Sequence, residues 1–264
     1  MMMRYNSQDN SGDKHSPRKS SSDFILGTRA VIEAVLAGKE IDKIFVRKNL
    51  ESDLLGELLN AIKGKDIPVQ RVPVEKLNRI TMKNHQGVVA FLSSVTYQKL
   101  EDIIPTLYEE GKVPFFILLD GITDVRNLGA IARTCDCAGA DAIVVPMTNS
   151  AGINADAVKT SAGALHTLTV CREKNLKDAM ILLKNSGVHV VAASEKAAKE
   201  YTEADYRGPL AIVMGAEDTG VAAEHLRICD ELVRIPLMGK IASLNVSDAA
   251  GILMYEALRQ SKNI

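Results

Sequence analysis

The second half of the sequence alternates short apolar runs with segments whose apolar residues recur at helical spacing. FFILLD, AIVVP and PLAIVMG are nearly continuous apolar runs, and each precedes a polar loop and a predicted helix. Strands that are apolar on both faces are typical of a parallel sheet covered by helices on either side. Residues 113–264 are therefore predicted to form an α/β domain with a mostly parallel sheet. Its ligand site is expected in the loops at the carboxyl ends of the strands.

A second, smaller α/β unit is predicted over residues 23–95. GTRAVIEAVLAG and SDLLGELLNAIKG have the spacing of amphipathic helices, the latter with Ser52 as N-cap, and IDKIFV, IPVQRV and VVAFLSSV have the β-branched content of strands. Residues 96–112, which contain Pro105, are expected to form a linker. Residues 1–22 are polar and Ser-rich, so we expect a disordered tail.

Composition excludes several classes of protein. No apolar run approaches the ~20 residues of a membrane-spanning helix, and the N-terminus lacks the apolar core of a secretory signal, so a cytoplasmic protein is expected. The five histidines and four cysteines show no metal-ligand spacing, so no metal is predicted. A net charge of −1 does not indicate nucleic-acid binding, and only local basic clusters could serve it.

Three loops of the second half are rich in small and polar residues. In DGITDVRNLGAIART, Asn127 is expected to cap a helix, and Gly129 is expected to clear space over Arg133 one turn later. In IVMGAEDTG, Gly215 would allow a ligand to approach the main chain, and Glu217 adds a carboxylate. Each of these loops is also compatible with an ordinary strand-to-helix turn.

The third loop opens the last helix in the stretch IPLMGKIASLNVSDAAGILMYE. Ser243 is expected to cap this helix, which leaves Asn245 and Ser247 free to reach a ligand. The sequence has no GxGxxG fingerprint after the first strand, no P-loop and no nucleophile elbow. A dinucleotide fold, a P-loop NTPase and an α/β hydrolase are therefore not indicated.

NLGAIART, VMGAEDTG and the third stretch together resemble the three ordered motifs of the SpoU (TrmH-type) RNA ribose 2′-O-methyltransferases of the SPOUT superfamily. GTRAVIEAVL and HQGVVA resemble the L30e-like substrate-binding domain of the bacterial 23S rRNA guanosine-2′-O-methyltransferase branch. The resemblance implies S-adenosylmethionine as methyl donor, ribosomal RNA as substrate, a homodimer and a C-terminal trefoil knot. The knot follows from the resemblance alone, because pattern reasoning does not predict knots.

The resemblance also implies site residues. The catalytic set is Asn127, Arg133, Glu217, Ser243 and Asn245. The cofactor set is Gly215, Ile235 and Leu244, with Ala193, Val213, Leu237 and Met238 nearby. Arg126, beside the catalytic loop, is expected to contact RNA, and the basic residues of the first unit chosen for the same role are Arg47, Lys48, Arg71, Lys83 and His85.

A guanidinium stays protonated near neutral pH, so Arg133 is expected to bind a phosphate and stabilise the developing alkoxide rather than to act as the base. Glu217 is expected to orient Arg133 or an Asn side chain. Two alternatives stay open at this point. One is ribose methylation of transfer RNA by the same catalytic domain, and the other is a non-catalytic RNA-binding protein that kept the fold.

Overall fold

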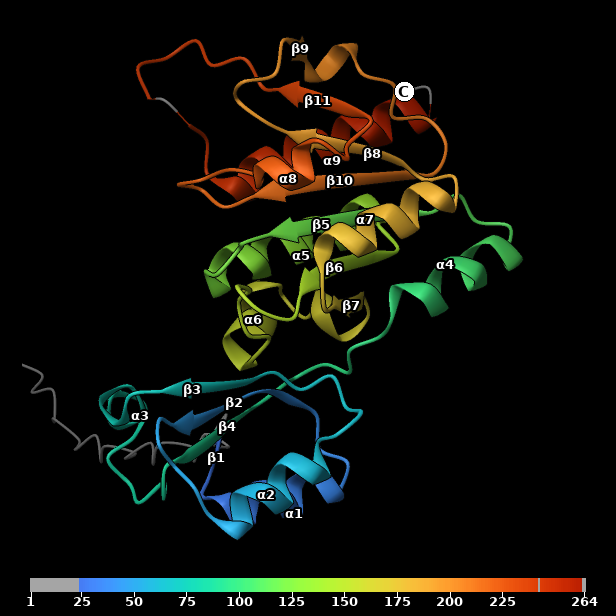
Figure 1. The fold of residues 1–264 in the computed structure, drawn as a ribbon. Coiled ribbons are helices and arrows are strands. Elements are labelled where there is room, and N and C mark those ends of the chain that lie inside the picture. Colours follow the sequence, from blue (N-terminus) through green and yellow to red (C-terminus); the bar gives the residue numbers. More distant parts are fainter. Residues whose placement is uncertain (1–23, 242, 263–264) are drawn as a thin grey trace, which may run out of the picture.

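The computed structural model describes residues 24–241 and 243–262, and within these ranges the chain forms a four-stranded and a seven-stranded sheet (Figure 1). The predicted tail, residues 1–22, lies outside the described residues. In the part that is described, no helix is long and apolar enough to cross a membrane.

The N-terminal unit is an α/β sandwich around the smaller sheet. Its elements are β1 (Phe24–Leu26), α1 (Thr28–Leu36), β2 (Ile41–Arg47), α2 (Asp53–Ala61), β3 (Val69–Val72), α3 (Val74–Ile80) and β4 (Val88–Leu92), in the sheet order β1-β4-β2-β3. Ser52 caps α2 as predicted, because its Oγ accepts from the amide of Leu55 at 3.2 Å. The strand β1 and the helix α3 were not predicted, since each is too short to show a clear period.

The two faces of this sheet differ in how they are covered. Ile44 and Val46 point toward α1 and α2 and are fully buried there. Phe45 and Val89 point to the opposite face, where the seven-residue helix α3 contributes Leu77. One short helix cannot cover a four-stranded sheet, so aromatic side chains of the second face stay partly exposed.

The segment expected to be a linker, residues 96–112, contains a packed helix, which the sequence did not predict. Residues Leu100–Glu109 form helix α4, which buries Leu100, Ile104 and Leu107 in the same cluster as α7 (Leu176–Asn185). Pro105 lies on the exposed side of α4. A proline there removes one backbone hydrogen bond, but the buried apolar face keeps the helix in place.

The C-terminal domain follows the predicted alternation of strands and helices. After α4 come β5 (Phe115–Asp120), α5 (Val125–Ala138), β6 (Ala142–Pro146), α6 (Ala155–Thr160), η1 (Ala164–His166), β7 (Thr169–Glu173), α7, β8 (His189–Ala193), β9 (Lys199–Glu200), η2 (Tyr201–Glu203), β10 (Leu210–Gly215), α8 (Ala223–Leu226), β11 (Glu231–Arg234) and α9 (Val246–Lys262). The sheet order is β7-β6-β5-β10-β8-β11-β9, with every pair parallel. The late strand β10 is therefore inserted between β5 and β8, which both precede it.

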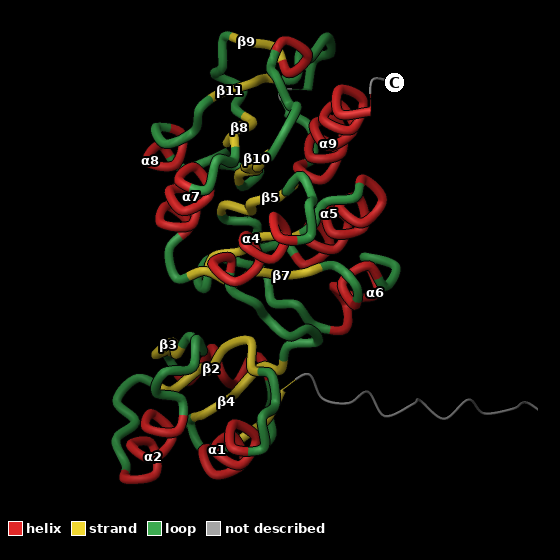
Figure 2. The backbone as a smooth tube through the Cα atoms, turned by 90° about the vertical axis from the view of Figure 1, so that its right-hand side faces the viewer, coloured by secondary structure: helices red, strands yellow, loops and turns green. Residues whose placement is uncertain are grey.

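Helices cover both faces of this sheet (Figure 2). The side chains of α5, α6 and α9 form one buried cluster with the sheet, and those of α4 and α7 form another on the opposite face. Burial on both faces explains why the strands are apolar along their length.

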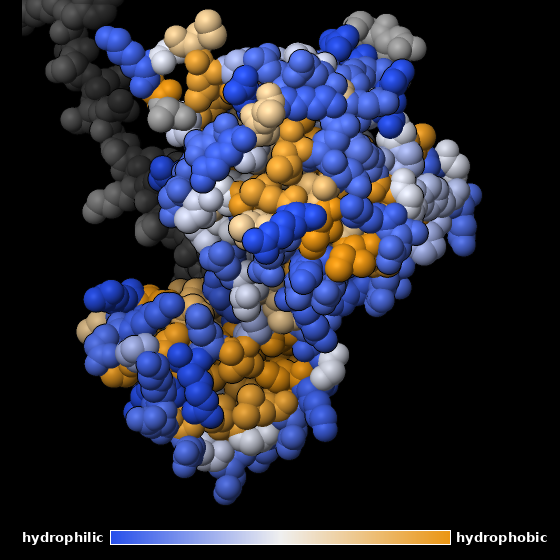
Figure 3. All heavy atoms as spheres, turned by 45° about the horizontal axis from the view of Figure 1, so that its top comes forward, coloured by the Kyte–Doolittle hydropathy of each residue, from blue (hydrophilic) through white to orange (hydrophobic). Residues whose placement is uncertain are grey.

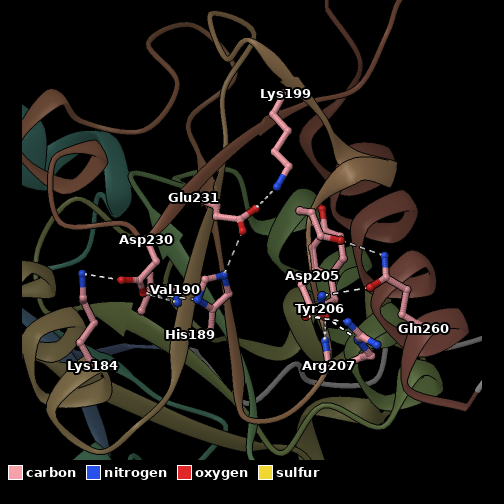
Figure 4. A network of polar contacts seen from close by, with 11 residues as sticks. Lys184, His189, Val190, Lys199, Asp205, Tyr206, Arg207, Asp230, Glu231 and Gln260 are labelled. Carbon is pink, nitrogen blue, oxygen red and sulfur yellow. Dashed lines mark hydrogen bonds and ion pairs between the residues drawn. The ribbon is translucent and has the colours of Figure 1, made fainter.

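Polar contacts hold the last strands at the edge of the sheet (Figure 4). Asp230 accepts from the amide of Val190 at 2.9 Å and pairs with Lys184 at 2.8 Å, and Lys199 pairs with Glu231 at 3.0 Å. These contacts join β8, β9 and β11, so the chain leaves β11 in a defined direction toward the loop before α9.

A buried arginine connects the two units. Arg172, on β7, donates from Nη1 to the carbonyl of Asp42 at 3.0 Å and from Nη2 to the carbonyl of Asp66 at 2.6 Å. Its guanidinium lies 3.7 Å from the centre of the Tyr97 ring, and the Tyr97 hydroxyl donates to Asp42 Oδ1 at 2.7 Å. The N-terminal unit is therefore attached to the edge strand of the larger sheet by specific contacts.

Candidate active site

The carboxyl ends of β8, β10 and β11 surround a cavity of about 310 Å³. Five residues of the predicted cofactor set line it: Ala193, Gly215, Ile235, Leu237 and Leu244. The other two do not. Val213 is fully buried inside β10 and contributes to packing, and Met238 is 96% exposed next to the cavity.

Three side chains from distant parts of the sequence meet beside this cavity. Asn127 donates from Nδ2 to Glu217 Oε1 at 3.1 Å. Asn245 donates from Nδ2 to Asn127 Oδ1 at 3.1 Å and to Glu217 Oε1 at 2.5 Å. The carboxylate thus accepts from both amides, which fixes the positions of all three groups. Glu217 and Ser243 also line the cavity, so the polar cluster and the cavity form one site.

The cap of α9 is Asn245, and the prediction that Ser243 caps this helix is wrong. Oδ1 of Asn245 accepts from the amide of Ser247 at 2.8 Å and from its hydroxyl at 2.6 Å. The other end of the same amide reaches Glu217 and Asn127. Capping therefore orients the side chain, and Ser247, predicted to be free, supports the cap.

Helix α5 is capped by Asp124, and the prediction of Asn127 as its cap is also wrong. Oδ1 of Asp124 accepts from the amides of Arg126 and Asn127 at 2.7 and 3.1 Å. Asn127 consequently lies in the first turn of α5, and its side chain is available for Glu217.

The loop that carries Glu217 depends on close packing of the backbone. A Cβ atom at Gly215 would lie 2.1 Å from the carbonyl carbon of Gly220, and Gly220 itself has a φ of +68°. Gly215 lines the cavity, where a ligand was expected to approach it, and its missing side chain also lets residues 216–220 fold back on β10.

A buried pair that sequence reasoning missed holds the far end of this loop. Oδ2 of Asp120, at the end of β5, accepts from the amide of Ala222 at 2.7 Å and lies 2.7 Å from Nδ1 of His225. Asp120 stands directly after an apolar run that was predicted as a strand, and that position was the signal available in the sequence. The pair connects the loop after β10 to the neighbouring strand.

Comparison with known proteins identifies the family. Residues 114–255 match the model of the SpoU rRNA Methylase family, and residues 24–98 match that for RNA 2′-O ribose methyltransferase substrate binding. This chain belongs to the SpoU rRNA methylase family. The prediction of a SpoU-type RNA methyltransferase with the α/β fold of the SPOUT superfamily is thereby confirmed.

Relatives match over nearly the whole length of this SpoU-family chain. It is 37% identical to the 23S rRNA (guanosine-2′-O-)-methyltransferase RlmB of Photobacterium profundum over 243 residues, 91% of this chain and 98% of the relative. It is 35% identical to the putative TrmH family tRNA/rRNA methyltransferase YacO of Bacillus subtilis, covering 90% of this chain and 96% of that one. The AdoMet-bound rRNA methyltransferase from Sinorhizobium meliloti superimposes with a TM-score of 0.58 at 28% identity, covering 89% and 86%.

The first SpoU motif also contributes residues that the structure keeps away from the cavity. Arg126 and Arg133 are exposed on α5 and do not line the cavity, and neither guanidinium makes a hydrogen bond or ion pair with another residue that the structure describes. Gly129 does not open space over Arg133. A Cβ there would lie 2.6 Å from Cβ of Thr160, so the glycine serves close packing between α5 and α6.

The RNA-binding residues predicted in the N-terminal unit gather around the ends of β2 and β3. The amides of Arg47 and Lys48 donate to Gly87 and Val72, and Arg71 donates to the carbonyl of Leu50 at 3.4 Å. His85 hydrogen-bonds Asn78 at 3.0 Å, and Lys83 follows α3. None of these five lines the cavity of the C-terminal domain.

At least two of the four thiols are held in their protonated form by burial. Burial raises the pKa of Cys171 and of Cys229 to about 12, so both stay protonated at neutral pH. Among the residues the structure describes, no three His, Cys, Asp or Glu side chains gather as a metal site.

Proposed function

We propose that this chain transfers the methyl group of S-adenosylmethionine to the ribose 2′-hydroxyl of a guanosine in 23S ribosomal RNA. The observation that carries the proposal is the meeting of Asn127, Glu217 and Asn245 beside the cavity at the ends of β8, β10 and β11. The RlmB relative supports the base and the RNA, because its name states both.

The cavity has the properties required for the donor. The cavity is lined by the loop that follows Gly215 on one side and by the apolar residues Ile235, Leu237 and Leu244 on the other. Leu237 and Leu244 are 41% and 38% exposed, so a bound nucleoside would remove apolar surface from water. The related rRNA methyltransferase of known structure holds this same molecule.

S-adenosylmethionine supplies a methyl group on a sulfonium, so transfer breaks the carbon–sulfur bond, forms a carbon–oxygen bond, leaves a neutral thioether and passes the hydroxyl proton to water. The hydrogen-bonded side chains of Asn127, Glu217 and Asn245 hold fixed positions and orient the ribose. Correct orientation of the reacting groups accounts for much of the rate in such displacements. Arg133 would bind the neighbouring phosphate and stabilise the negative charge that develops on the oxygen. Glu217 orients the two Asn side chains and does not take the proton.

Arg133 is proposed to act on the cavity of a second copy of the chain. Arg133 is exposed on α5, next to the side of this helix that packs against α9. The two helices are close there, because a Cβ added at Gly251 of α9 would lie 3.7 Å from the methyl group of Thr134 on α5. Tyr255 on this face is 51% exposed, although it is a large side chain on a helix that buries its other side. A homodimer through α5 and α9 would cover Tyr255 and present Arg133 to the partner.

Mixed dimers test this arrangement. Arg133→Ala and Asn245→Ala chains, each inactive alone, are co-refolded at equal amounts and assayed for transfer of tritiated methyl groups to 23S RNA. If Arg133 acts on the partner's cavity, random pairing restores about a quarter of the wild-type sites. If each chain serves its own cavity, no activity returns, and light scattering shows whether a dimer formed at all.

Ribosomal RNA is favoured over transfer RNA by the extent of the matches. The TrmH/SpoU tRNA modifying enzyme of A. aeolicus covers 62% of this chain, whereas the rRNA methyltransferase from Sinorhizobium meliloti covers 89%. The rRNA enzyme therefore resembles a larger part of this chain than the tRNA enzyme does, which supports ribosomal RNA as the substrate. Mass spectrometry of ribosomal and transfer RNA from a strain without this gene would identify which RNA has lost a methyl group. Loss of a methyl group from transfer RNA, with ribosomal RNA unchanged, would contradict the proposal.

A non-catalytic role is tested by binding of the donor. Isothermal titration of the chain with S-adenosylmethionine should give a saturable heat, which Leu244→Asp, by placing a charge on the apolar wall, should abolish. A wild-type chain that binds no donor would favour an RNA-binding protein without activity.

A further inference from the structure

A second hollow, distinct from the active site, lies where the N-terminal unit faces the catalytic domain. It is a groove of about 820 Å³. One wall comes from β1, β2, α3 and β4. The other comes from Thr123 and Val125 next to the first SpoU motif and from Ser150, Ala151, Gly152 and Asn154. The groove therefore leads from the substrate-binding unit to the start of α5, which carries Asn127.

The floor of the groove is aromatic. Phe45 and Phe91 contact edge to face with their centroids 5.2 Å apart, and Phe24 lies 6.4 Å from Phe91 in the same manner. Phe24 and Phe91 are partly exposed because α3 covers only part of this sheet face. Figure 3 shows apolar residues gathered on the N-terminal unit and bordered by hydrophilic ones. A partly exposed aromatic cluster at the junction of two units is typical of a binding surface.

Positive charges stand over these rings. Nζ of Lys76 lies 4.7 Å from the centre of the Phe45 ring, and Nζ of Lys43 lies 5.6 Å from that of Phe91. Arg79 lines the same wall and is exposed.

Two carboxylates also line the groove, Asp42 and Glu75. Asp42 is already engaged by the Tyr97 hydroxyl and faces the guanidinium of Arg172 at 3.9 Å, as well as Lys43 at 3.6 Å. Its charge is therefore compensated by the contacts between the units. The charged side chains that line the groove are three cations, Lys43, Lys76 and Arg79, and these two carboxylates, so its lining is net positive by one charge, and Arg172 adds a further cation beside Asp42.

We infer that this groove binds an unpaired, single-stranded segment of the RNA substrate adjacent to the nucleotide that is methylated. The inference rests on the proposed function, which makes RNA the substrate. Phe24 and Phe91 would stack on bases, and Lys43, Lys76 and Arg79 would contact the phosphates between them. None of the five basic residues chosen from the sequence for RNA contact in this unit lines the groove.

The geometry favours a single strand over a duplex. Bases inside a helix are stacked on each other and their faces are unavailable to a phenyl ring, so a duplex could use only the cations. A splayed strand uses both rings and cations. It also leaves the following ribose free to enter the catalytic domain past Thr123 and Val125.

Binding of a labelled oligoribonucleotide tests the inference. A single strand of roughly twelve nucleotides, within the range of single-strand sites, is compared by fluorescence anisotropy with the fully paired duplex of the same sequence. The wild-type chain should bind the single strand more tightly. Phe91→Leu, which keeps an apolar side chain in the cluster, should weaken this binding roughly 10-fold, the effect of losing one stacked base.

The cations are tested by salt dependence with a matched control. Lys76→Gln should lower the slope of log affinity against log salt by about 0.7, as expected for one lost phosphate contact to a single strand. Lys63→Gln removes an exposed charge after α2, outside the groove, and should leave the slope unchanged. Thermal melts establish that each variant is folded.

The outcomes separate this inference from the proposed function. If the duplex binds as tightly as the single strand, or if Phe91→Leu binds like the wild type, the groove is not a single-strand site even where methyl transfer is normal. If the wild-type chain binds the single strand with the predicted pattern but takes up no S-adenosylmethionine, the proposed function is wrong and the groove stands. Photocrosslinking of 4-thiouridine RNA should label the peptides of Phe24 or Phe91, and labelling confined to other peptides would overturn the assignment.

Discussion

At the scale of single residues, Asn245 does two things with one side chain. Its oxygen accepts from the amide and hydroxyl of Ser247 and so begins α9, while its NH₂ group donates to Glu217 and Asn127. Because the oxygen is held by the cap, the NH₂ group of Asn245 points toward Glu217 and Asn127. This explains why an amide is required there, since aspartate or serine would cap the helix equally well.

Two substitutions separate the roles of Asn245. Asn245→Ala removes the cap and the donors, so it should lower the free energy of unfolding by about 1 kcal/mol and abolish methyl transfer. Asn245→Ser keeps a capping oxygen, so stability should stay near that of the wild type while activity still falls about 100-fold. Urea denaturation and a tritium transfer assay measure the two effects. Full activity of Asn245→Ser would show that the amide donors are not needed.

The site residues could be read from the sequence, but their local roles could not. Asn127, Glu217 and Asn245 were found through the resemblance, and the structure brings these three together. The caps were assigned wrongly because Asp124 and Asn127, or Ser243 and Asn245, have similar capping preferences. Which of two nearby residues caps a helix depends on where the chain enters the helix, and tertiary packing decides that.

At the scale of elements, the first SpoU motif is shaped by how closely α5 approaches α6. Gly129 is buried, and an added Cβ would lie 2.9 Å from the carbonyl oxygen of Ala157 and closer still to Thr160. The helical propensity lost by a glycine is thus offset by packing. The opposite end of α5 then lies against α9, so both helices of the site are placed by small residues.

A pair of glycine substitutions checks this account. Gly129→Ala should destabilise the protein by about 1–3 kcal/mol, because an interface that is already in contact would have to move. Gly56→Ala is the control, since this α2 glycine has open space around its Cβ and ordinary helical φ. It should stabilise by about 0.5–1 kcal/mol. Equal effects of the two changes in thermal denaturation would mean that packing at Gly129 is unimportant.

At the scale of the whole molecule, the two units are joined through a few buried polar contacts. Arg172 binds the carbonyls of Asp42 and Asp66 and stacks on Tyr97. Lys99 and Lys174 both pair with Asp66 around it. The groove depends on these contacts, because one of its walls belongs to each unit.

Removing the central cation should loosen this attachment. Arg172→Met leaves the carbonyls of Asp42 and Asp66 without their donor and removes the cation that faces the Asp42 carboxylate, so we expect a loss of about 3 kcal/mol. Calorimetry should then show the N-terminal unit melting separately at lower temperature. Lys174→Met is the control, because that side chain is 73% exposed and such pairs contribute at most about 1 kcal/mol. A single unchanged transition for Arg172→Met would contradict the assigned role.

Acid should weaken the same attachment. The hydrogen bond from Lys99 lowers the pKa of Asp66 below its usual value, against the effect of its partial burial. A carboxylate with a lowered pKa in the folded state stabilises the fold above its ordinary pKa of about 3.9, and this contribution is lost as the pH falls further. Stability measured between pH 6 and about pH 3 should therefore drop less steeply for Asp66→Asn than for the wild type. Parallel curves would exclude this carboxylate as a cause.

The sequence by itself determined the type and order of most elements, the parallel sheet and the family, because periodicity and motifs are local properties of the chain. It could not show that β10 enters between β5 and β8, that residues 96–112 contain a packed helix, or that an aromatic groove opens between the units. Asn127 is 90 residues from Glu217 and 118 from Asn245, and only tertiary folding brings them within hydrogen-bonding distance. Which residues become neighbours in this way depends on how helices and strands far apart in the sequence pack their apolar faces together. Short-range sequence patterns do not contain that information.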